Sequence, residues 1–246
     1  RKTVIENAAE AVYTEKKAEE MEVVFLMNRF GYAKVIDTAA YERNKEAAEG
    51  ENKYVISCKN TGRICVFTNT GQLHTVKVSD IPFGKFRDKG IPIDNISNFN
   101  GEKESVIAVH SQTSLNLYRM VFTTKLAMMK VVDGGEFDVA KRTVAATRLS
   151  EGDEVADVTV LNEQRQVVLR SAEGFFLKFD VEEIPEKKKN AVGVRGMKLG
   201  QDDFIEEVYY TKTGEPQVIE YKNRPLDLNK MKTAKRDGKG TKPRGL

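Results

Sequence analysis

Clusters of Lys and Arg are the residues of this sequence whose chemistry points to a function. They recur in four places along the chain, most of them beside Gly, Pro or small polar residues. Lys and Arg neutralise phosphates and release counterions, and nearby glycines let backbone N–H groups approach phosphate oxygens. The clusters therefore predict binding to a polyanion. They comprise Lys85, Arg87 and Lys89; Lys141, Arg142 and Arg148; Lys187, Lys188 and Lys189; and Lys235, Arg236, Lys239 and Lys242.

The charge is unevenly distributed along the chain. The 40 Lys and Arg residues nearly balance the 37 Asp and Glu residues, for a net charge of +3. Residues 222–246, however, carry nine basic and two acidic side chains, whereas residues 151–221 are acidic. A basic tail on a balanced body indicates a polyanionic partner, and a solvated terminal segment is the other interpretation.

No residues stand in a pattern typical of catalysis or of a metal or cofactor site. Cys58 and Cys65 have no C-x-x-C spacing, and the two histidines have no H-x-x-x-H spacing. The sequence has no GxxxxGK[ST] run, and Asp202-Asp203 is interpreted as a solvated turn. We therefore expect no catalytic residue, no metal and no cofactor. The cysteines are predicted to be buried reduced thiols on paired strands.

Residues 55–82 predict the elements that hold the basic clusters. Apolar and polar residues alternate there with period two around turns that end at Gly62 and Gly71, which predicts a three-stranded antiparallel meander. The stretch occurs twice, always at the same offset, and a repeated β unit indicates a repeat architecture. The matching positions are Val55 and Val158, Gly71 and Gly174, and Ile81-Pro82 and Ile184-Pro185.

Five repeat units fit the chain. Their spacing of roughly 40–50 residues is typical of propeller-like folds with four-stranded blades. We expect a single all-β domain over residues 1–246, with residues 3–5 as a strand that closes a ring and residues 42–52 as a polar loop. No apolar run approaches the roughly 20 residues that a membrane span needs. The aligned turn positions are Gly31, Gly71, Leu126, Gly174 and Pro225.

Several motifs together resemble the C-terminal domain of type IIA DNA topoisomerase A subunits, in DNA gyrase or topoisomerase IV. The resemblance covers essentially the whole chain. It implies a β-pinwheel, a propeller-like ring of about five blades, that binds and bends double-stranded DNA around its rim. It also implies DNA contacts by Lys34 and Arg195. The motifs are Gly31-Tyr32-Ala33-Lys34, the hairpins with a turn Gly, the Ile-Pro strand ends, and Val192-Gly193-Val194-Arg195-Gly196.

The resemblance favours the A subunit of topoisomerase IV over that of gyrase. In gyrase the first blade is followed by a basic box, Gln-Arg-Arg-Gly-Gly-Lys-Gly, whereas residues 42–52 lack such a box and carry four Glu. A degenerate copy stands at residues 234–240, where Asp237 places a negative charge within it.

The resemblance also bears on activity. The family's nucleophilic Tyr follows an Arg in the cleavage core, and no Arg-Tyr dipeptide occurs here, so this piece is not expected to be an enzyme alone. The chain, which begins at Arg1, is expected to be excised from an ATP-dependent topoisomerase. That parent would form a heterotetramer with the ATPase B subunit in the bacterial cytoplasm, at the nucleoid. The alternatives are a protein-interaction propeller, disfavoured by the lack of Trp, and a propeller enzyme, for which no channel site is evident.

Overall fold

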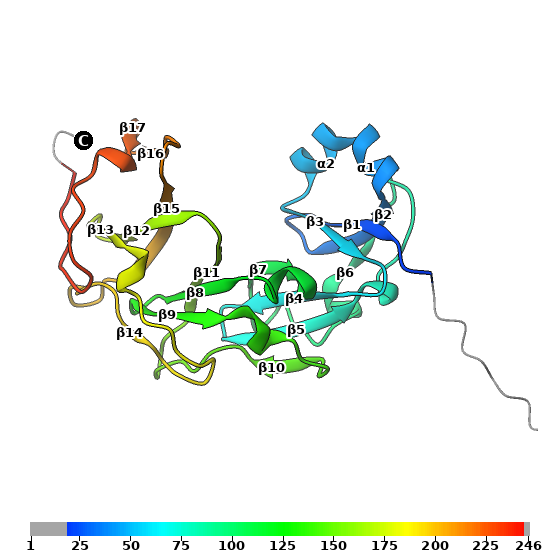
Figure 1. Cartoon of the computed structure of the whole chain (residues 1–246), viewed down its shortest axis with the longest axis horizontal. Coiled ribbons are helices and arrows are strands. Elements are labelled where there is room, and N and C mark those ends of the chain that lie inside the picture. The colour runs from blue at the N-terminus through cyan, green and yellow to red at the C-terminus, as the bar shows by residue number, and fades with distance from the viewer. Residues whose placement is uncertain (1–18, 244–246) are drawn as a thin grey trace, which may run out of the picture.

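Five antiparallel β-sheets follow one another along an arc. The computed structural model of the chain describes residues 19–243, so the predicted closing strand at residues 3–5 lies outside the described part. The first and fifth sheets stand at the two ends of the arc, and the arc is open between them (Figure 1). Three sheets have four strands, the fourth has three and the fifth has two. The predicted all-β pinwheel is confirmed, although the expected ring is an open arc within residues 19–243.

Each of the first three sheets contains one hairpin and two strands from later in the chain. The first strand of a hairpin pairs with a strand that lies before the next hairpin in the chain, and the second strand pairs with a strand beyond that next hairpin. This exchange links each sheet to its successor. The first sheet contains β1 (Glu22–Met27), β2 (Tyr32–Asp37), β3 (Tyr54–Lys59) and β6 (Ile91–Pro92); the second contains β4 (Arg63–Thr68), β5 (Gln72–Lys77), β7 (Val106–Ser111) and β10 (Thr143–Ala145). The third contains β8 (Arg119–Thr124), β9 (Met128–Asp133), β11 (Val155–Leu161) and β14 (Val194–Arg195); the fourth contains β12 (Gln164–Ser171), β13 (Phe176–Asp180) and β15 (Ile205–Lys212); the fifth contains β16 (Val218–Tyr221) and β17 (Arg224–Asp227).

The predicted three-stranded meander at residues 55–82 is wrong in its first strand. β4 and β5 form a hairpin, but β3 pairs with β1 of the first sheet. The alternation of apolar and polar residues shows which face of a strand is buried, but not which strand it pairs with. The turn before β4 can therefore connect two strands of one sheet or strands of two different sheets. Cys58 and Cys65 therefore lie in different sheets, and both are buried free thiols, as the sequence predicted.

The five hairpin turns place a left-handed residue before each second strand. Gly31, Gly71 and Gly174 have φ of 81°, 77° and 83° as predicted. In the third hairpin the residue is Ala127 (φ 64°) and not Leu126, and in the fifth it is Asn223 (φ 60°) and not Pro225. Ala127 N–H donates to the Thr124 carbonyl as Gly71 N–H donates to Thr68, so the same turn forms without glycine.

Residues 42–52, predicted to be a polar loop, are mostly helical. The Asp37 carboxylate accepts a 2.7 Å hydrogen bond from the Ala40 N–H and caps the first helix. Ala40 and Ala48 are buried against Val24, Leu26 and Ile36 of the first sheet, which stabilises two helices too short to persist alone. The helices are α1 (Thr38–Arg43), α2 (Lys45–Glu51) and α3 (Gln112–Leu115), with 3-10 turns at Val78–Asp80, Ile93–Asn95, Gly134–Phe137, Val181–Glu183 and Leu228–Lys230.

The hydrophobic core lies between neighbouring sheets. One buried cluster joins the first and second sheets, a second joins the second and third, and a third joins the third and fourth. In the second cluster the Phe67 and Phe122 rings meet edge to face with centroids 5.8 Å apart. Each sheet thus buries its faces on its neighbours, which sets the spacing of the outer segments along the arc. Within residues 19–243 the longest helices are far shorter and less apolar than a bilayer-crossing helix.

Candidate nucleic-acid interface

Four loops occupy equivalent places in successive sheets, and we call them the outer loops. They are residues 83–90, 138–142, 186–193 and 232–240. The first three lead into β6, β10 and β14, and the fourth leads into Thr241, which bridges to Phe176 of β13. The first and third outer loops begin with the same contact to the second hairpin strand. The Val35 N–H donates to the carbonyl of Pro82, just before the first loop, and the Val131 N–H donates to the carbonyl of Pro185, just before the third.

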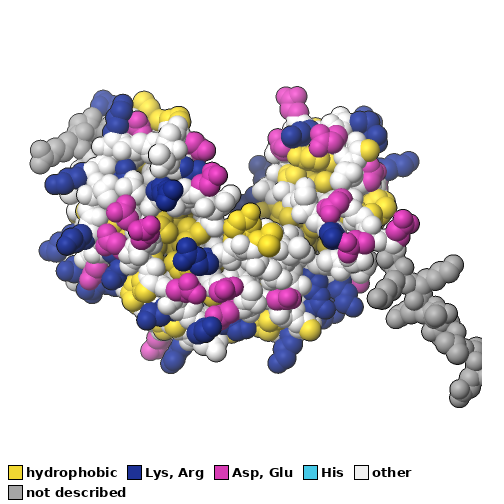
Figure 2. Space-filling view, viewed as in Figure 1, with side chains coloured by type: hydrophobic (Ala, Val, Ile, Leu, Met, Phe, Trp, Pro, Cys, Tyr) yellow, Lys and Arg dark blue, Asp and Glu magenta, His cyan; other side chains and the backbone are white. Residues whose placement is uncertain are grey.

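The outer loops face away from the concave side of the arc. β10, β14 and the C-terminal segment follow its outer edge, whereas β3, β7, β11 and β15 lie towards the opening (Figure 1). Lys and Arg side chains gather along the same outer edge in the space-filling view (Figure 2). The repeat therefore brings basic clusters that are far apart in sequence onto one continuous side.

The structure brings most of the predicted cations into the outer loops. Four lie elsewhere: Lys34 on β2, Arg148 after β10, Arg195 on β14 and Lys242 just beyond the fourth loop. The side chains that are exposed and form no ion pair within the described residues are Lys85, Arg87, Lys89, Lys141, Arg142, Arg148, Lys187, Lys235, Lys239 and Lys242. These groups are available to a polyanion.

Two of the predicted cations, Arg195 on β14 and Arg236 in the fourth outer loop, are engaged within the protein. The Arg195 guanidinium forks onto the Asp237 carboxylate at 2.6 and 3.2 Å, which raises the pKa of Arg195 and lowers that of Asp237. Arg236 donates from Nε to the Glu183 carbonyl at 3.0 Å and from Nη1 to the Arg195 carbonyl at 2.6 Å. Both arginines thus hold the fourth loop, and a phosphate would compete with those bonds.

The cations of the third and second outer loops form weaker contacts within the protein than Arg195 and Arg236 do. Lys188 forms an ion pair with Glu136 at 3.3 Å although its side chain stays 86% exposed, so that pair is largely solvent-screened. Lys189 is partly buried and donates to the Glu136 carbonyl at 3.1 Å. In the second loop, Arg142 donates to the Ile96 carbonyl at 3.1 Å.

Lys34, predicted to contact DNA, turns towards its own sheet. Its Nζ donates to the carbonyls of Phe86 and Asp88 in loop 83–90. Desolvation lowers the pKa of Lys34, as expected for an ammonium taken partly out of water. Its DNA contact stays a prediction, and its observed partners are backbone oxygens.

Arg63, which is not among the predicted site residues, supports the second loop. Its Nη1 donates to the carbonyls of Val139 and Ala140 at 3.0 and 2.9 Å. No motif marks this Arg, because its partners are backbone atoms far along the chain. For chemistry other than binding, no group of three His, Cys, Asp or Glu within residues 19–243 could hold a metal ion.

An arc of exchanged four-stranded sheets with basic outer loops defines a β-pinwheel domain. Residues 62–112, 119–162 and 166–212 match the family model described as the DNA gyrase C-terminal domain, β-propeller. The chain belongs to this family, which includes the C-terminal domains of DNA gyrase A and topoisomerase IV A subunits.

Curated relatives are similar along most of the chain. The DNA gyrase A subunit of Lawsonia intracellularis is 26% identical over 98% of this chain and 31% of that protein. The DNA gyrase A subunit of Helicobacter pylori strain 26695 is 28% identical over 83% of this chain and 26% of that protein. The chain thus spans a third or less of the length of these relatives.

Solved structures share the fold. The C-terminal domain of DNA topoisomerase IV superposes with a TM-score of 0.79 at 20% identity, over 92% of this chain and 73% of that one. The E. coli ParC C-terminal domain gives 0.72 at 17% identity, over 92% and 95%. The DNA gyrase A C-terminal domain gives 0.61 at 16% identity, over 90% and 76%.

Proposed function

We propose that this domain binds duplex DNA without sequence preference and bends it around the outer side of the arc. The observation that carries the proposal is the equivalence of the four outer loops, which aligns exposed cations on consecutive sheets. Membership of a DNA gyrase domain family supports the same interpretation.

The arrangement suits a stiff, uniformly charged partner. Each Lys or Arg that neutralises a phosphate releases counterions, and this gain does not depend on base sequence. Bending a duplex of about 20–30 base pairs costs on the order of 1–6 kcal/mol, so the contacts must be distributed along the curve. A row of basic loops on a convex surface distributes them in that way.

The parent protein would be an ATP-dependent type IIA topoisomerase. In it, this domain would present a DNA segment to the cleavage core. The parent would form a heterotetramer with an ATPase B subunit in the bacterial cytoplasm, at the nucleoid. The relatives that are DNA gyrase A subunits, of which the chain covers about a third or less, support this placement. The domain itself would supply binding and no cleavage chemistry.

We further propose a topoisomerase IV type of parent. The support is that residues 42–52, where the gyrase resemblance places its basic glycine-rich box, are mostly helical and carry four Glu. Relaxed circular DNA treated with the domain and a relaxing topoisomerase tests this point. Little net supercoiling is expected, and strong supercoiling of one hand would instead assign a gyrase type.

A binding titration tests the main proposal. Duplex affinity should fall steeply between about 50 and about 200 mM salt, with a slope of about −0.9 per phosphate contacted. The triple variant K85A/R87A/K89A should lose at least about tenfold in affinity and flatten the slope by about 2.7. The triple variant K45A/K103A/K222A removes equal charge away from the outer loops and should change little. Binding that ignores salt, or equal losses in both variants, would contradict the proposal.

A further inference from the structure

One position of the repeat carries side chains that are buried or partly buried beside the outer loops. It is the third residue after the left-handed turn residue, and in the first four sheets it is Lys34, His74, Lys130 and Leu177. Each lies on the second hairpin strand, beside the segment that follows an outer loop: β6, β10 and β14 in the first three sheets and the bridging Thr241 in the fourth. Three of the four side chains are polar.

Lys130 is the most fully buried of them, with 1% of its surface exposed. Its Nζ donates to three loop carbonyls, those of Lys188 at 3.3 Å, Lys189 at 2.7 Å and Ala191 at 2.6 Å. It also lies 5.6 Å from the centre of the Phe122 ring. An ammonium so placed cannot reach a phosphate, and every proton it has is used to hold the loop that carries Lys187, Lys188 and Lys189.

Lys34 repeats this arrangement in the first sheet. Its Nζ donates to the carbonyls of Phe86 and Asp88, within the loop that carries Lys85, Arg87 and Lys89. A glycine stands over the lysine in both sheets: a Cβ on Gly90 or Gly193 would lie 3.3 Å from the Cβ of Lys34 or Lys130. The lysine and the glycine therefore form a repeated pair.

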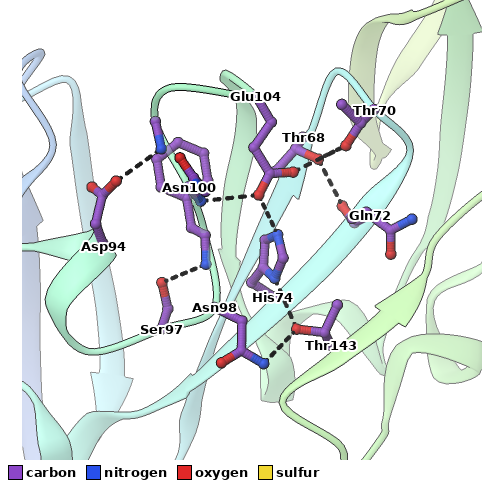
Figure 3. A network of polar contacts seen from close by, with 12 residues as sticks. Thr68, Thr70, Gln72, His74, Asp94, Ser97, Asn98, Asn100, Glu104 and Thr143 are labelled. Atoms are coloured by element: carbon purple, nitrogen blue, oxygen red, sulfur yellow. Dashed lines mark hydrogen bonds and ion pairs between the residues drawn. The ribbon is translucent and has the colours of Figure 1, made fainter.

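His74 takes the same place in the second sheet with different chemistry. Its Nδ1 is 2.9 Å from the Thr143 hydroxyl, directly across the ladder, and its Nε2 is 2.7 Å from Glu104. Glu104 also accepts from the Asn100 N–H at 3.1 Å and the Thr70 hydroxyl at 3.0 Å (Figure 3). The imidazole thus connects β10, which follows the second outer loop, to the segment before β7.

We propose that Lys34, His74 and Lys130 are positioning residues that hold three outer loops in the shape in which their cations meet DNA. The proposal rests on the proposed function. A loop held in one conformation before binding loses less conformational entropy on contact, so its cations contribute more to affinity. Leu177 has no polar group, and the fourth loop is held by Arg236 and Asp237 instead.

Crossed double-mutant cycles between positioning residues and loops test the proposal. K130M should weaken duplex binding about three- to tenfold, and K34M should do the same. K130M should have almost no further effect in the K187A/K188A/K189A background but its full effect in the K85A/R87A/K89A background. K34M should show the reverse pattern. This coupling to one loop only is expected because each lysine orders one loop.

Three outcomes would overturn the proposal: a full K130M effect in its own triple-alanine background, equal effects of both variants in both backgrounds, and unchanged binding by both. K125M, which removes an exposed lysine of the adjacent turn, is the charge control. Amide exchange without DNA separates this failure from failure of the proposed function. K130M should speed exchange at Lys187, Lys189 and Ala191 while Val121, on the other strand of the hairpin, stays protected. Unchanged exchange at these loop amides would refute the positioning role whether or not DNA binds.

Discussion

The third and fourth outer loops share a backbone design but hold their cations differently. In both, a left-handed glycine, Gly193 or Gly240, passes close to a carbonyl of the second hairpin strand. The third loop is held by Lys130, and its Lys187 and Lys188 are exposed whereas Lys189 is partly buried. The fourth loop has Leu177 at the equivalent position. Its own Arg236 and Asp237 help to hold it, together with the Gln166 amide, which donates to the Thr233 hydroxyl.

Equal basic composition therefore does not mean equal capacity to bind a polyanion. The third loop is held by the Lys130 ammonium, which is not one of its exposed charges. The fourth loop uses its own Arg236 for internal hydrogen bonds, and its Asp237 neutralises Arg195. A count of Lys and Arg in the sequence therefore overestimates the number of cations that the fourth loop offers to a polyanion, compared with the third loop.

The largest expected effect comes from removing the glycine of the third loop. A Cβ at Gly193, with φ of 103°, would lie 2.4 Å from the Met129 carbonyl oxygen, so G193A should lower the free energy of unfolding by at least about 3 kcal/mol. Gly152 also has a left-handed φ, of 73°, but open space around it, so G152A should cost only about 1 kcal/mol. Urea unfolding measures both, and equal costs would show that the close approach does not matter.

A second test uses the buried charge of Lys130. Desolvation lowers its pKa to about 8, whereas the unfolded value is about 10.4. Between these values the unfolded chain binds more protons, so the free energy of unfolding should rise with pH. From about pH 7.5 to about pH 9.5 the rise should be about 2 kcal/mol greater in the wild type than in K130M. Parallel pH profiles would mean that Lys130 titrates as it does in water.

The smallest expected effect concerns the fourth loop. D237N removes the negative charge that faces Arg195 and keeps a side chain that tolerates the left-handed backbone of Asp237 (φ 67°). Duplex affinity should therefore rise about three- to tenfold, and the salt slope should steepen by about 0.9. Loss of this largely exposed ion pair should change the stability little. E42A removes an exposed carboxylate that lies on α1, outside the outer loops, and is the matched control. A fall in duplex affinity in D237N would contradict this expectation. It would show that the Arg195–Asp237 pair raises affinity by ordering the loop more than it lowers affinity by neutralising Arg195.

The repeat, the hairpin turns and the basic loops could be predicted from the sequence because each has a local signal. Gly31, Gly71 and Gly174 mark turns that need a left-handed residue. Strand exchange could not be predicted, since alternation along β3 says nothing about whether its partner is β1 or β4. Helices α1 and α2 were missed because packing of Ala40 and Ala48, not intrinsic propensity, stabilises them.

Some of the charged residues could be predicted from the sequence and others could not. Exposed cations such as Lys85 and Lys187 were found because charge clusters are visible in sequence. Lys130 was missed because it stands alone among apolar residues, and its partners are backbone oxygens about 60 residues away. Alignment of the hairpin turns on Ala127 in place of Leu126 would have superposed it on Lys34.

Energy transfer between dyes at the two ends of a duplex of about 30 base pairs tests the central claim most directly. The wild-type domain should bring the ends together in a salt-dependent way, and K85A/R87A/K89A and K187A/K188A/K189A should each reduce the bend because each removes one part of the curved contact. Binding that leaves the duplex straight, or bending that survives the loss of both loops, would contradict DNA held along the outer side of the arc.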